Sequence, residues 1–404
     1  MTQEILEQVE QYKQTHILKF FNELSDEEKS GLIRQIERID FSKILKPDDN
    51  VNTKDRAISP INVLDTETIQ ESYAAFMQIG MEALKSGSVG LVLLSGGQGS
   101  RLGFQQSKGM FNIGISKKVY LFQILLDNVR KIVESVGNWL YIFIMTSPQN
   151  NEQIIQFFEE NDYFDYNKEY VKFYIQSSLP SINFDGKLLM KSKGELCFSP
   201  DGNGSFFYTL KNTPLWNIIK NCGIKWLNVF SIDNVLQKMA DPVFIGATIG
   251  SNCNCGAKVV KKKCPQEKIG VICLKNKAPA VIEYYELSDK LNAATDTNTP
   301  YNYGVILNYL FKIDVLEKIP QDMLPLHYAK KHINCIDENG IPDTSGQLNA
   351  YKLEYLITDL IEYMKTCLPF EVVREREFAP LKNRVGVDSI DSARKMLLQN
   401  GYDL

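Results

Sequence analysis

The 404-residue chain is poor in the residues on which several common enzyme classes depend. It has only three histidines, and His327 and His332 are five positions apart, so these two do not share a helix face. The chain therefore has few of the histidines that a zinc enzyme or a histidine-dependent hydrolase needs. No apolar run reaches the roughly 18 residues that a membrane helix needs. Residues 1–19 also lack the apolar stretch of a secretory signal, so we expect a soluble, cytoplasmic protein.

An excess of one charge and a cysteine framework are also missing. The 45 Lys and Arg residues against 49 Asp and Glu residues give a net charge of −4, which excludes a global positive field for nucleic acid. The eight cysteines include no C-x-x-C pair. Cys253, Cys255 and Cys264 are poorly spaced for zinc, with no histidine near, and we expect free thiols. The sequence therefore predicts neither a nucleic-acid partner nor a membrane partner.

What the chain does contain is an alternation of strand and helix signals. Residues 1–85 favour helices, and Ser25, with Glu28 three positions on, forms a capping box. Beyond Val89 the alternation predicts an α/β fold with a mostly parallel sheet and helices on both faces. We expect strands at 91–94, 140–145, 171–175 and 226–232, short strands over 256–286, and helices at 120–135, 151–160, 205–221, 349–366 and 388–399.

The sharpest motif is a glycine loop, residues 96–99, directly after the strand expected at 91–94. Three glycines in four positions let the backbone approach a ligand closely, with N–H groups aimed at phosphate or at a base edge. Arg101 and Lys108 add positive charge beside it, which indicates a polyphosphate site. A P-loop does not fit, because glycine follows Lys108, and a dinucleotide fingerprint fails because Leu102 replaces its last glycine. The alternative is a tight turn without a ligand.

Other polar positions are ambiguous when taken alone. Asp233 closes the strand expected at 226–232, and ligands of parallel α/β sheets sit at the carboxyl ends of strands. An Asp there could hold Mg²⁺ bridging phosphates, with a helix cap as the equal alternative. The turn-rich loop 200–204 could simply be a connection, and Lys382 a solvated surface charge.

Together these segments resemble the signature of the eukaryotic-type UDP-N-acetylglucosamine (UDP-N-acetylhexosamine) pyrophosphorylase family. The family pattern G-G-Q-G-T-R-L-G, followed by P-K-G-M-F, is similar to residues 96–103 and 107–111. Further segments match in the same order, so that the resemblance covers about residues 90–400. These segments are 179–180, 184–187, 200–204, 232–236, 240–246, 255–260, 282–284 and 377–383.

The resemblance implies a fold and a division of the chain. The fold is a Rossmann-like, GT-A-like nucleotidyltransferase of the α/β class, with a mixed, mostly parallel sheet flanked by helices. A helical N-terminal segment would cover residues 1–88, the catalytic domain 89–376, and a short C-terminal segment 377–404. The further C-terminal domain of many members is expected to be absent, which favours a monomer.

The resemblance also implies a reaction. UTP and N-acetylglucosamine 1-phosphate would give UDP-N-acetylglucosamine and pyrophosphate, with Mg²⁺. The sugar phosphate attacks the α-phosphorus of UTP in line, so catalysis needs positioning and charge neutralisation rather than a protein nucleophile. Such a mechanism fits a chain poor in histidine.

Carried over position by position, the resemblance implies a role for twelve residues. The catalytic residues would be Arg101, Lys108, Asp233 and Lys382, with Asp233 as the Mg²⁺ ligand. The nucleotide-binding residues would be Gly96, Gly97, Gln176 and Gly202. The sugar-binding residues would be Asn203, Gly270, Glu283 and Asn302.

Departures from the family pattern mainly concern the sugar. Tyr303 and Val305 stand where the family has Ala and Asn, and Leu356 and Thr358 stand where it has aromatic residues near the N-acetyl group. Ser107 replaces a proline, which is expected to loosen the loop before the lysine. N-Acetylglucosamine 1-phosphate is expected first, with N-acetylgalactosamine or glucose 1-phosphate as alternatives.

Two other classes of protein share parts of this pattern. A glycosyltransferase with a similar nucleotide fold usually holds its metal with Asp-x-Asp, whereas Asn234 and Val235 follow Asp233 here. A nucleotide-sugar sensor without catalysis would be expected to lose the charged residues of the site, yet all four remain.

Overall fold

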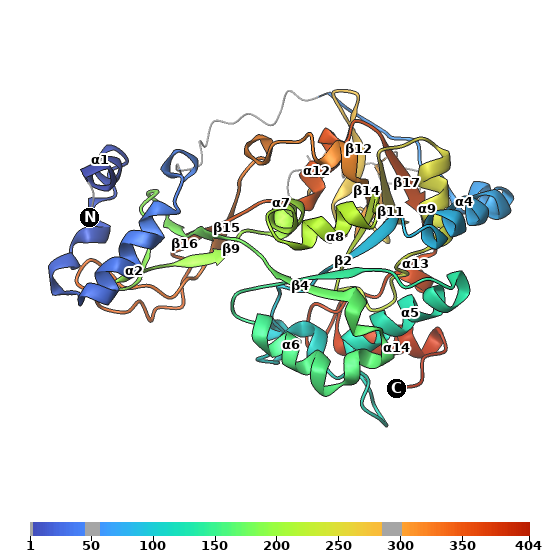
Figure 1. The fold of residues 1–404 in the computed structure, drawn as a ribbon, viewed down its shortest axis with the longest axis horizontal. Coiled ribbons are helices and arrows are strands. Elements are labelled where there is room, and N and C mark those ends of the chain that lie inside the picture. The colour runs from blue at the N-terminus through green and yellow to red at the C-terminus, as the bar shows by residue number, and fades with distance from the viewer. Residues whose placement is uncertain (1–2, 45–56, 285–300) are drawn as a thin grey trace. The chain divides into compact units, whose positions relative to one another are not determined.

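The structure, a computed structural model, describes residues 3–44, 57–284 and 301–404. The chain forms two compact units (Figure 1). The first combines Met1–Asp55, Ser177–Ser205 and Leu324–Leu356, and the second combines Arg56–Gln176, Phe206–Met323 and Ile357–Leu404. The division at residues 88 and 376 follows chain order and stays a prediction. Of the helices in the described ranges, none has the length and apolar character that a membrane crossing requires.

In its described residues, the first unit contains the α-helices α1 (Gln3–Gln11) and α2 (Asp26–Glu37) and small antiparallel sheets. Its largest sheet has the order β15 (His327–Lys331), β16 (Ala350–Glu354) and β6 (Ile182–Asn183). The predicted capping box is confirmed, because Ser25 and Glu28 each accept a hydrogen bond from the other's backbone amide. Leu32 and Ile36 of α2 share one hydrophobic core with Leu353 of β16.

A mixed sheet forms the centre of the second unit. Its order is β1-β12-β14-β10-β2-β3-β4, with β13 beside β12 and with β11 between β14 and β17. The bounds are β1 (Ile58–Ser59), β2 (Val89–Leu94), β3 (Ile142–Thr146), β4 (Val171–Ile175), β10 (Trp226–Ser231), β11 (Cys255–Lys261), β12 (Val271–Lys275), β13 (Ala278–Ile282), β14 (Tyr303–Lys312) and β17 (Cys367–Glu371). Strands β10, β2, β3 and β4 run parallel. The predicted mixed α/β sheet is confirmed.

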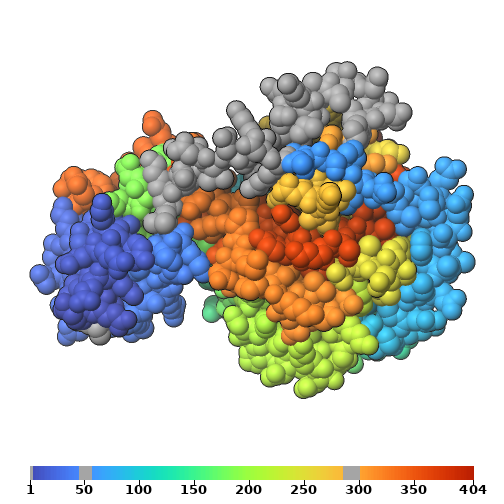
Figure 2. All heavy atoms as spheres, turned by 90° about the horizontal axis from the view of Figure 1, so that it is seen from above, coloured from blue at the N-terminus to red at the C-terminus, as the bar shows by residue number. Residues whose placement is uncertain are grey.

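Helices cover this sheet because its central strands are apolar on both sides. Every residue of β2 and β10 is buried, as in sheets with helices on both faces. Figure 1 shows α5 (Leu121–Val136), α6 (Asn151–Glu160) and α14 (Ile390–Gln399) on one side of β2 and β4, and α7 (Phe206–Lys211) with α8 (Leu215–Asn221) on the other. In Figure 2, β1 in blue lies against the gold β12–β13 hairpin.

Two predicted helices differ from the structure. The helix expected at 205–221 is two helices, α7 and α8, with Pro214 at the N-cap of the second; proline removes a backbone donor and interrupts the helix. The helix expected at 349–366 is wrong, because this segment holds strand β16 and the short helix α12 (Ile357–Tyr363). Pairing of β16 with β15 and β6 overrides the helical spacing of its apolar residues. Leu356 therefore lies outside both elements.

Helices α4 (Tyr73–Lys85) and α9 (Pro242–Gly250) meet backbone to backbone. A Cβ added at Gly80 would lie 1.8 Å from the carbonyl oxygen of Pro242. A Cβ added at Gly246 would lie 1.8 Å from the carbonyl oxygen of Phe76. No residue other than glycine fits at either position without separating the helices. The contact between α4 and α9 therefore fixes the position of α9 and of the chain segment that leads into it.

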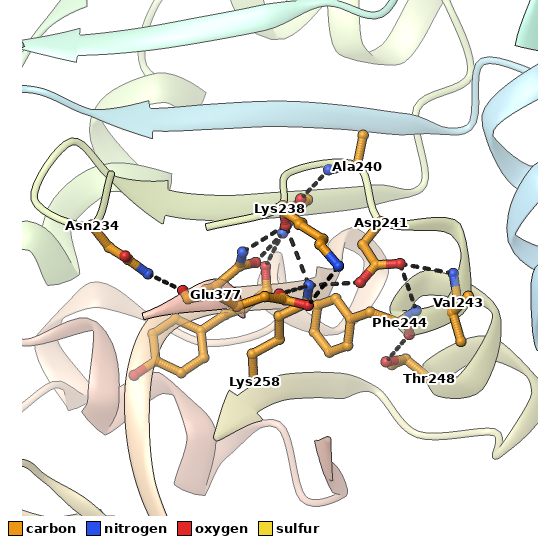
Figure 3. Close-up of polar contacts among 12 residues, drawn as sticks. Asn234, Lys238, Ala240, Asp241, Val243, Phe244, Thr248, Lys258 and Glu377 are labelled. Atoms are coloured by element: carbon orange, nitrogen blue, oxygen red, sulfur yellow. Dashed lines mark hydrogen bonds and ion pairs between the residues drawn. The ribbon is translucent and has the colours of Figure 1, made fainter. Parts of the chain in front are cut away.

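A buried ammonium group joins β11 to the start of α9 and to the end of α13 (Arg374–Glu377), as Figure 3 shows. Lys258 Nζ lies 2.7 Å from Asp241 Oδ2 and 2.6 Å from Glu377 Oε2, and its side chain is 0% exposed. Burial opposes the charge of Lys258, but the two carboxylates outweigh it and raise its pKa. Asp241 also caps α9 by accepting from the Val243 amide, so one residue links the helix and the ion cluster.

Replacing Gly80 or Gly246 by Ala should destabilise the protein by about 1–3 kcal/mol, because overpacking at a backbone contact forces α4 and α9 apart. Urea unfolding followed by circular dichroism measures the loss. Gly250→Ala is the matched control in the same helix, since an added Cβ there meets only the end of the Ile79 side chain, at 3.1 Å. This control should be neutral or stabilising by up to about 1 kcal/mol, and equal losses in all three variants would contradict the account.

Lys258→Met should lower the free energy of unfolding by about 3–5 kcal/mol, because it removes the buried cation that pairs with the largely buried carboxylates of Asp241 and Glu377. Lys117→Met, which removes an exposed pair with Asp403, should cost less than about 1 kcal/mol. Adding Asp241→Asn and Glu377→Gln to Lys258→Met should recover part of the loss in the same urea experiment. A triple variant no more stable than Lys258→Met alone would refute the assignment of the loss to unpaired charge.

Candidate active site

The glycine loop leaves the carboxyl end of β2 and lies against Gln176, which follows β4. A Cβ added at Gly96 would lie 2.7 Å from Gln176 Oε1, and the Gln176 side chain is buried. An added Cβ at Gly97 would have nothing within 4 Å, so the loop is open at this position. The structure therefore brings together three of the predicted nucleotide-binding residues, at one edge of the parallel strands.

Lys108 and Asp233 meet at the ends of two adjacent parallel strands. Strands β2 and β10 pair in register, and the Ile232 amide donates to the Leu94 carbonyl at 3.2 Å. This register places the end of β10 beside the glycine loop, where the Lys108 amide donates to the Gly97 carbonyl at 3.4 Å. Lys108 Nζ donates to Asp233 Oδ1 at 2.7 Å. The side chain of Lys108 is 9% exposed and that of Asp233 is 47% exposed. The lysine is therefore buried, whereas the aspartate is accessible to solvent.

The loop that carries Lys382 is bonded to the segment that carries Asp233. The Leu381 amide donates to the Asp233 carbonyl at 2.8 Å. The neighbouring Asn234 side chain donates to the Glu377 carbonyl at 2.7 Å, as Figure 3 shows, and accepts from the Ala379 amide at 2.9 Å. These bonds keep Lys382 beside Asp233, with Lys382 Nζ 3.3 Å from Asp388 Oδ2.

A pocket of about 200 Å³ joins the phosphate end of the site to the predicted sugar residues. Asp233 and Lys382 line it together with Gly270 and Glu283. An added Cβ at Gly270 would lie 2.9 Å from Val281 Cγ1 and 3.4 Å from Glu283 Oε1, so Gly270 and the Glu283 carboxylate lie close together and the crowding there comes mainly from Val281. Concave sites with a few convergent polar groups are the usual form of small-molecule sites.

The remaining four of the twelve predicted site residues are Gly202, Asn203, Asn302 and Arg101, and their roles stay predictions. Gly202 and Asn203 belong to the first unit, and Gly202 has a local reason to be glycine, because its φ is +89° and an added Cβ would meet the Tyr355 carbonyl at 2.3 Å. The Asn302 carbonyl accepts from the Lys262 amide at 2.8 Å at the start of β14. Arg101 is exposed and forms no ion pair with the described residues.

The same pocket contains residues that motif reasoning missed. Lys268 lines it and forms no ion pair with the described residues, so it adds a second cation beside Lys382. Its position two residues before Gly270 was the available signal. Tyr309 also lines the pocket, and burial, followed by the nearby Glu283, raises its pKa. Leu307, in β14, has a φ of +54°, a strained backbone of the kind found at functional sites.

The substitutions that bear on sugar choice occupy different environments. Val305 lines the pocket. The Tyr303 hydroxyl instead donates to Glu371 Oε2 at 3.3 Å, beside Lys261, and Tyr303 is not among the residues that line the pocket in the described part of the chain. Ser107 has a φ of −55°, within the range that proline imposes, so serine keeps the backbone shape that a proline would have here.

Comparison with known proteins identifies a family for this arrangement. Residues 38–394 match the model of the UDPGP family, described as UTP–glucose-1-phosphate uridylyltransferase. The chain is 33% identical to UDP-N-acetylglucosamine diphosphorylase 2 of Arabidopsis thaliana, over 98% of the chain and 83% of that protein. It is 33% identical to UDP-N-acetylglucosamine pyrophosphorylase of Saccharomyces cerevisiae, over 96% of the chain and 88% of that protein.

Solved structures agree with the sequence comparison. An inhibitor complex of uridine diphosphate N-acetylglucosamine pyrophosphorylase from Trypanosoma brucei has a TM-score of 0.79 and 25% identity, covering 97% of this chain and 83% of that one. A UDP-glucose pyrophosphorylase from Leishmania major, 16% identical with a TM-score of 0.61 over 80% of this chain and 68% of that one, shares the fold. The chain, with its glycine loop, its Lys108–Asp233 pair and its adjoining pocket, belongs to the UTP–glucose-1-phosphate uridylyltransferase family.

Proposed function

We propose that this protein transfers the uridylyl group of UTP to N-acetylglucosamine 1-phosphate, giving UDP-N-acetylglucosamine and pyrophosphate. The observation that carries the proposal is the meeting of Lys108 and Asp233 between the glycine loop and the pocket that holds Gly270 and Glu283. The names of the Arabidopsis and yeast relatives support N-acetylglucosamine as the sugar.

The residues divide the work of an in-line displacement. Gly96 and Gln176 would hold the uracil edge, Gln176 through its amide, and Gly97 leaves the loop open for the ribose. Arg101 and Lys108 would hold the triphosphate, and Lys382 would neutralise charge on the phosphates. Catalysis then comes from positioning and from cations fixed where negative charge grows on the leaving pyrophosphate. No side chain needs to act as a nucleophile.

The donor set around Asp233 fits a magnesium ion that arrives with the nucleotide. Mg²⁺ keeps several waters and is usually bound by one or two carboxylates plus substrate phosphates. Among the described residues no group of three or more His, Cys, Asp and Glu side chains converges, so the protein alone builds no metal cage. Asp233 would hold the ion, which would supply charge neutralisation to the triphosphate. Lys108 also lies against this carboxylate, at 2.7 Å.

Glu283 and Gly270 would bind the sugar, and Asn203 and Asn302 are further predicted sugar contacts. A carboxylate that accepts from sugar hydroxyls suits Glu283, because a half-buried carboxylate needs hydrogen-bond donors. Val305, in place of the family Asn, gives this pocket an apolar wall. N-Acetylgalactosamine and glucose 1-phosphates stay alternative substrates. We also propose a cytoplasmic monomer acting on small molecules, and the net charge of −4 supports such substrates over nucleic acid.

Lys108→Ala and Asp233→Ala should each lower turnover by at least about 10²-fold in a folded protein, because each removes a fixed charge from the reacting phosphates. Pyrophosphate release with UTP and N-acetylglucosamine 1-phosphate measures turnover, and circular dichroism checks the fold. Lys211→Ala, an exposed lysine outside the site, is the control and should keep full activity. Near wild-type turnover in either site variant would remove that residue from the mechanism.

The sugar assignment is tested by pyrophosphate release with a panel of 1-phosphates of N-acetylglucosamine, N-acetylgalactosamine, glucose and galactose. N-Acetylglucosamine 1-phosphate should give the highest kcat/KM. Preference for glucose 1-phosphate would keep the chemistry and overturn the substrate. No release with any sugar, from folded protein that binds UTP, would favour a sensor. Val305→Asn should shift the preference more than Tyr303→Phe, because only Val305 lines the pocket.

A further inference from the structure

A second pocket lies in the same unit as the active site and shares no lining residue with the first. Its volume is about 290 Å³. Buried Leu236, Met239 and Pro242 supply an apolar lining, and Tyr402 adds an aromatic ring. The pocket is therefore large enough, and apolar enough, for a small organic molecule.

Three cations stand around this apolar lining, and their present bonds are few and long. Lys131, on α5, forms no ion pair with the described residues. Arg376 donates to the Asn400 side chain at 3.4 Å, and Lys238 Nζ lies 3.4 Å from Glu377 Oε1. All three side chains are exposed. They are therefore available to a bound anion without loss of a strong interaction.

The one carboxylate that lines the pocket is already neutralised. Asp241 is bonded to the buried Lys258 at 2.7 Å and to the amides at the start of α9. Burial opposes the charge of Asp241, but Lys258 outweighs it and holds the pKa of this carboxyl below its usual range. The field inside the pocket is therefore set by the three cations, and it favours an anion.

The walls of this pocket are connected to the loops of the active site. Lys238 contacts Glu377, whose backbone carbonyl accepts from Asn234, the residue after Asp233 (Figure 3). Arg376 precedes Glu377 in α13 (Arg374–Glu377), which leads into the loop that carries Lys382. An anion that draws Lys238 and Arg376 toward the pocket changes the charges around Glu377, and so acts on both loops.

We propose that this pocket binds a small organic phosphate, held by Lys131, Lys238 and Arg376 with its carbon skeleton on the apolar lining, and that binding there is coupled to the active site. Phosphate suits three cations that line one pocket, because lysine and arginine form charge-assisted hydrogen bonds with it. The coupling rests on the proposed function of the Asp233 and Lys382 loops, whereas the binding site does not.

Isothermal titration calorimetry with glucose 6-phosphate tests the site, because this phosphomonoester has no anomeric phosphate and is not a substrate of the proposed reaction. The active site is first saturated with UDP-N-acetylglucosamine. The dissociation constant should be about 1 mM or lower, and Lys131→Glu should weaken binding by about 10-fold or more, as expected for loss of a charge-assisted bond. Lys211→Glu carries the same charge change outside both pockets and should leave binding unchanged.

The outcomes separate the site from the coupling. No binding up to about 10 mM, or binding that Lys131→Glu leaves intact, would overturn the site. Titrations with and without UDP-N-acetylglucosamine measure the coupling, and we expect the affinity for glucose 6-phosphate to change by about 5-fold or more, the size of a typical coupling. Equal affinities in the two titrations would overturn the coupling. Loss of catalysis in the pyrophosphate assay would overturn the proposed function and leave the calorimetric result standing.

Discussion

A single buried ammonium group, that of Lys258, sets the positions of the two loops on which the candidate chemistry depends. It stands on β11 and bonds Asp241 at the start of α9 and Glu377 just before the lysine loop. Moving the three charges out of water costs several kcal/mol per ion. Their mutual attraction offsets that cost only when the geometry is excellent. Such a cluster therefore adds little net stability when complete, but it strongly disfavours any arrangement in which one partner is missing. The cluster therefore specifies position, because it allows the segment after β10, which carries Asp233, and the loop that carries Lys382 to meet in only one way.

The site itself is an electrostatic device assembled at the edge of a parallel sheet. Two neighbouring strands, β2 and β10, end in register, so the backbone of the glycine loop and the carboxylate of Asp233 reach the same small volume. Lys108 completes a charge-balanced pair whose hydrogen bond orients both side chains before substrate arrives. Folding has already oriented these charges, so they need little reorganisation when the reaction takes place.

Much of this could be predicted from the sequence where the signal is local. The capping box at Ser25, the buried strand before the glycines and Asp233 at a strand end all depend on a few adjacent residues. The resemblance to a family added Gln176, Gly270 and Glu283, which no local rule would select. The prediction from sequence was wrong where pairing with distant strands determines the structure. The apolar spacing after residue 349 suits a helix, yet β16 forms there because it pairs with β15 and β6. The second pocket could not be predicted from the sequence, because its three cations come from separate segments of the chain.

The division of the chain has a consequence for how the protein is made. The core of the first unit joins residues from α1 and α2 to Ile182, Leu196 and finally Leu353 of β16. A ribosome delivers these pieces in order, so α1 and α2 emerge roughly 300 residues before β16, the last strand that supplies this core. Domains ordinarily fold as units as they appear. Here neither unit completes its core early, because the first unit needs Leu353 and the second needs Leu397 and Leu404.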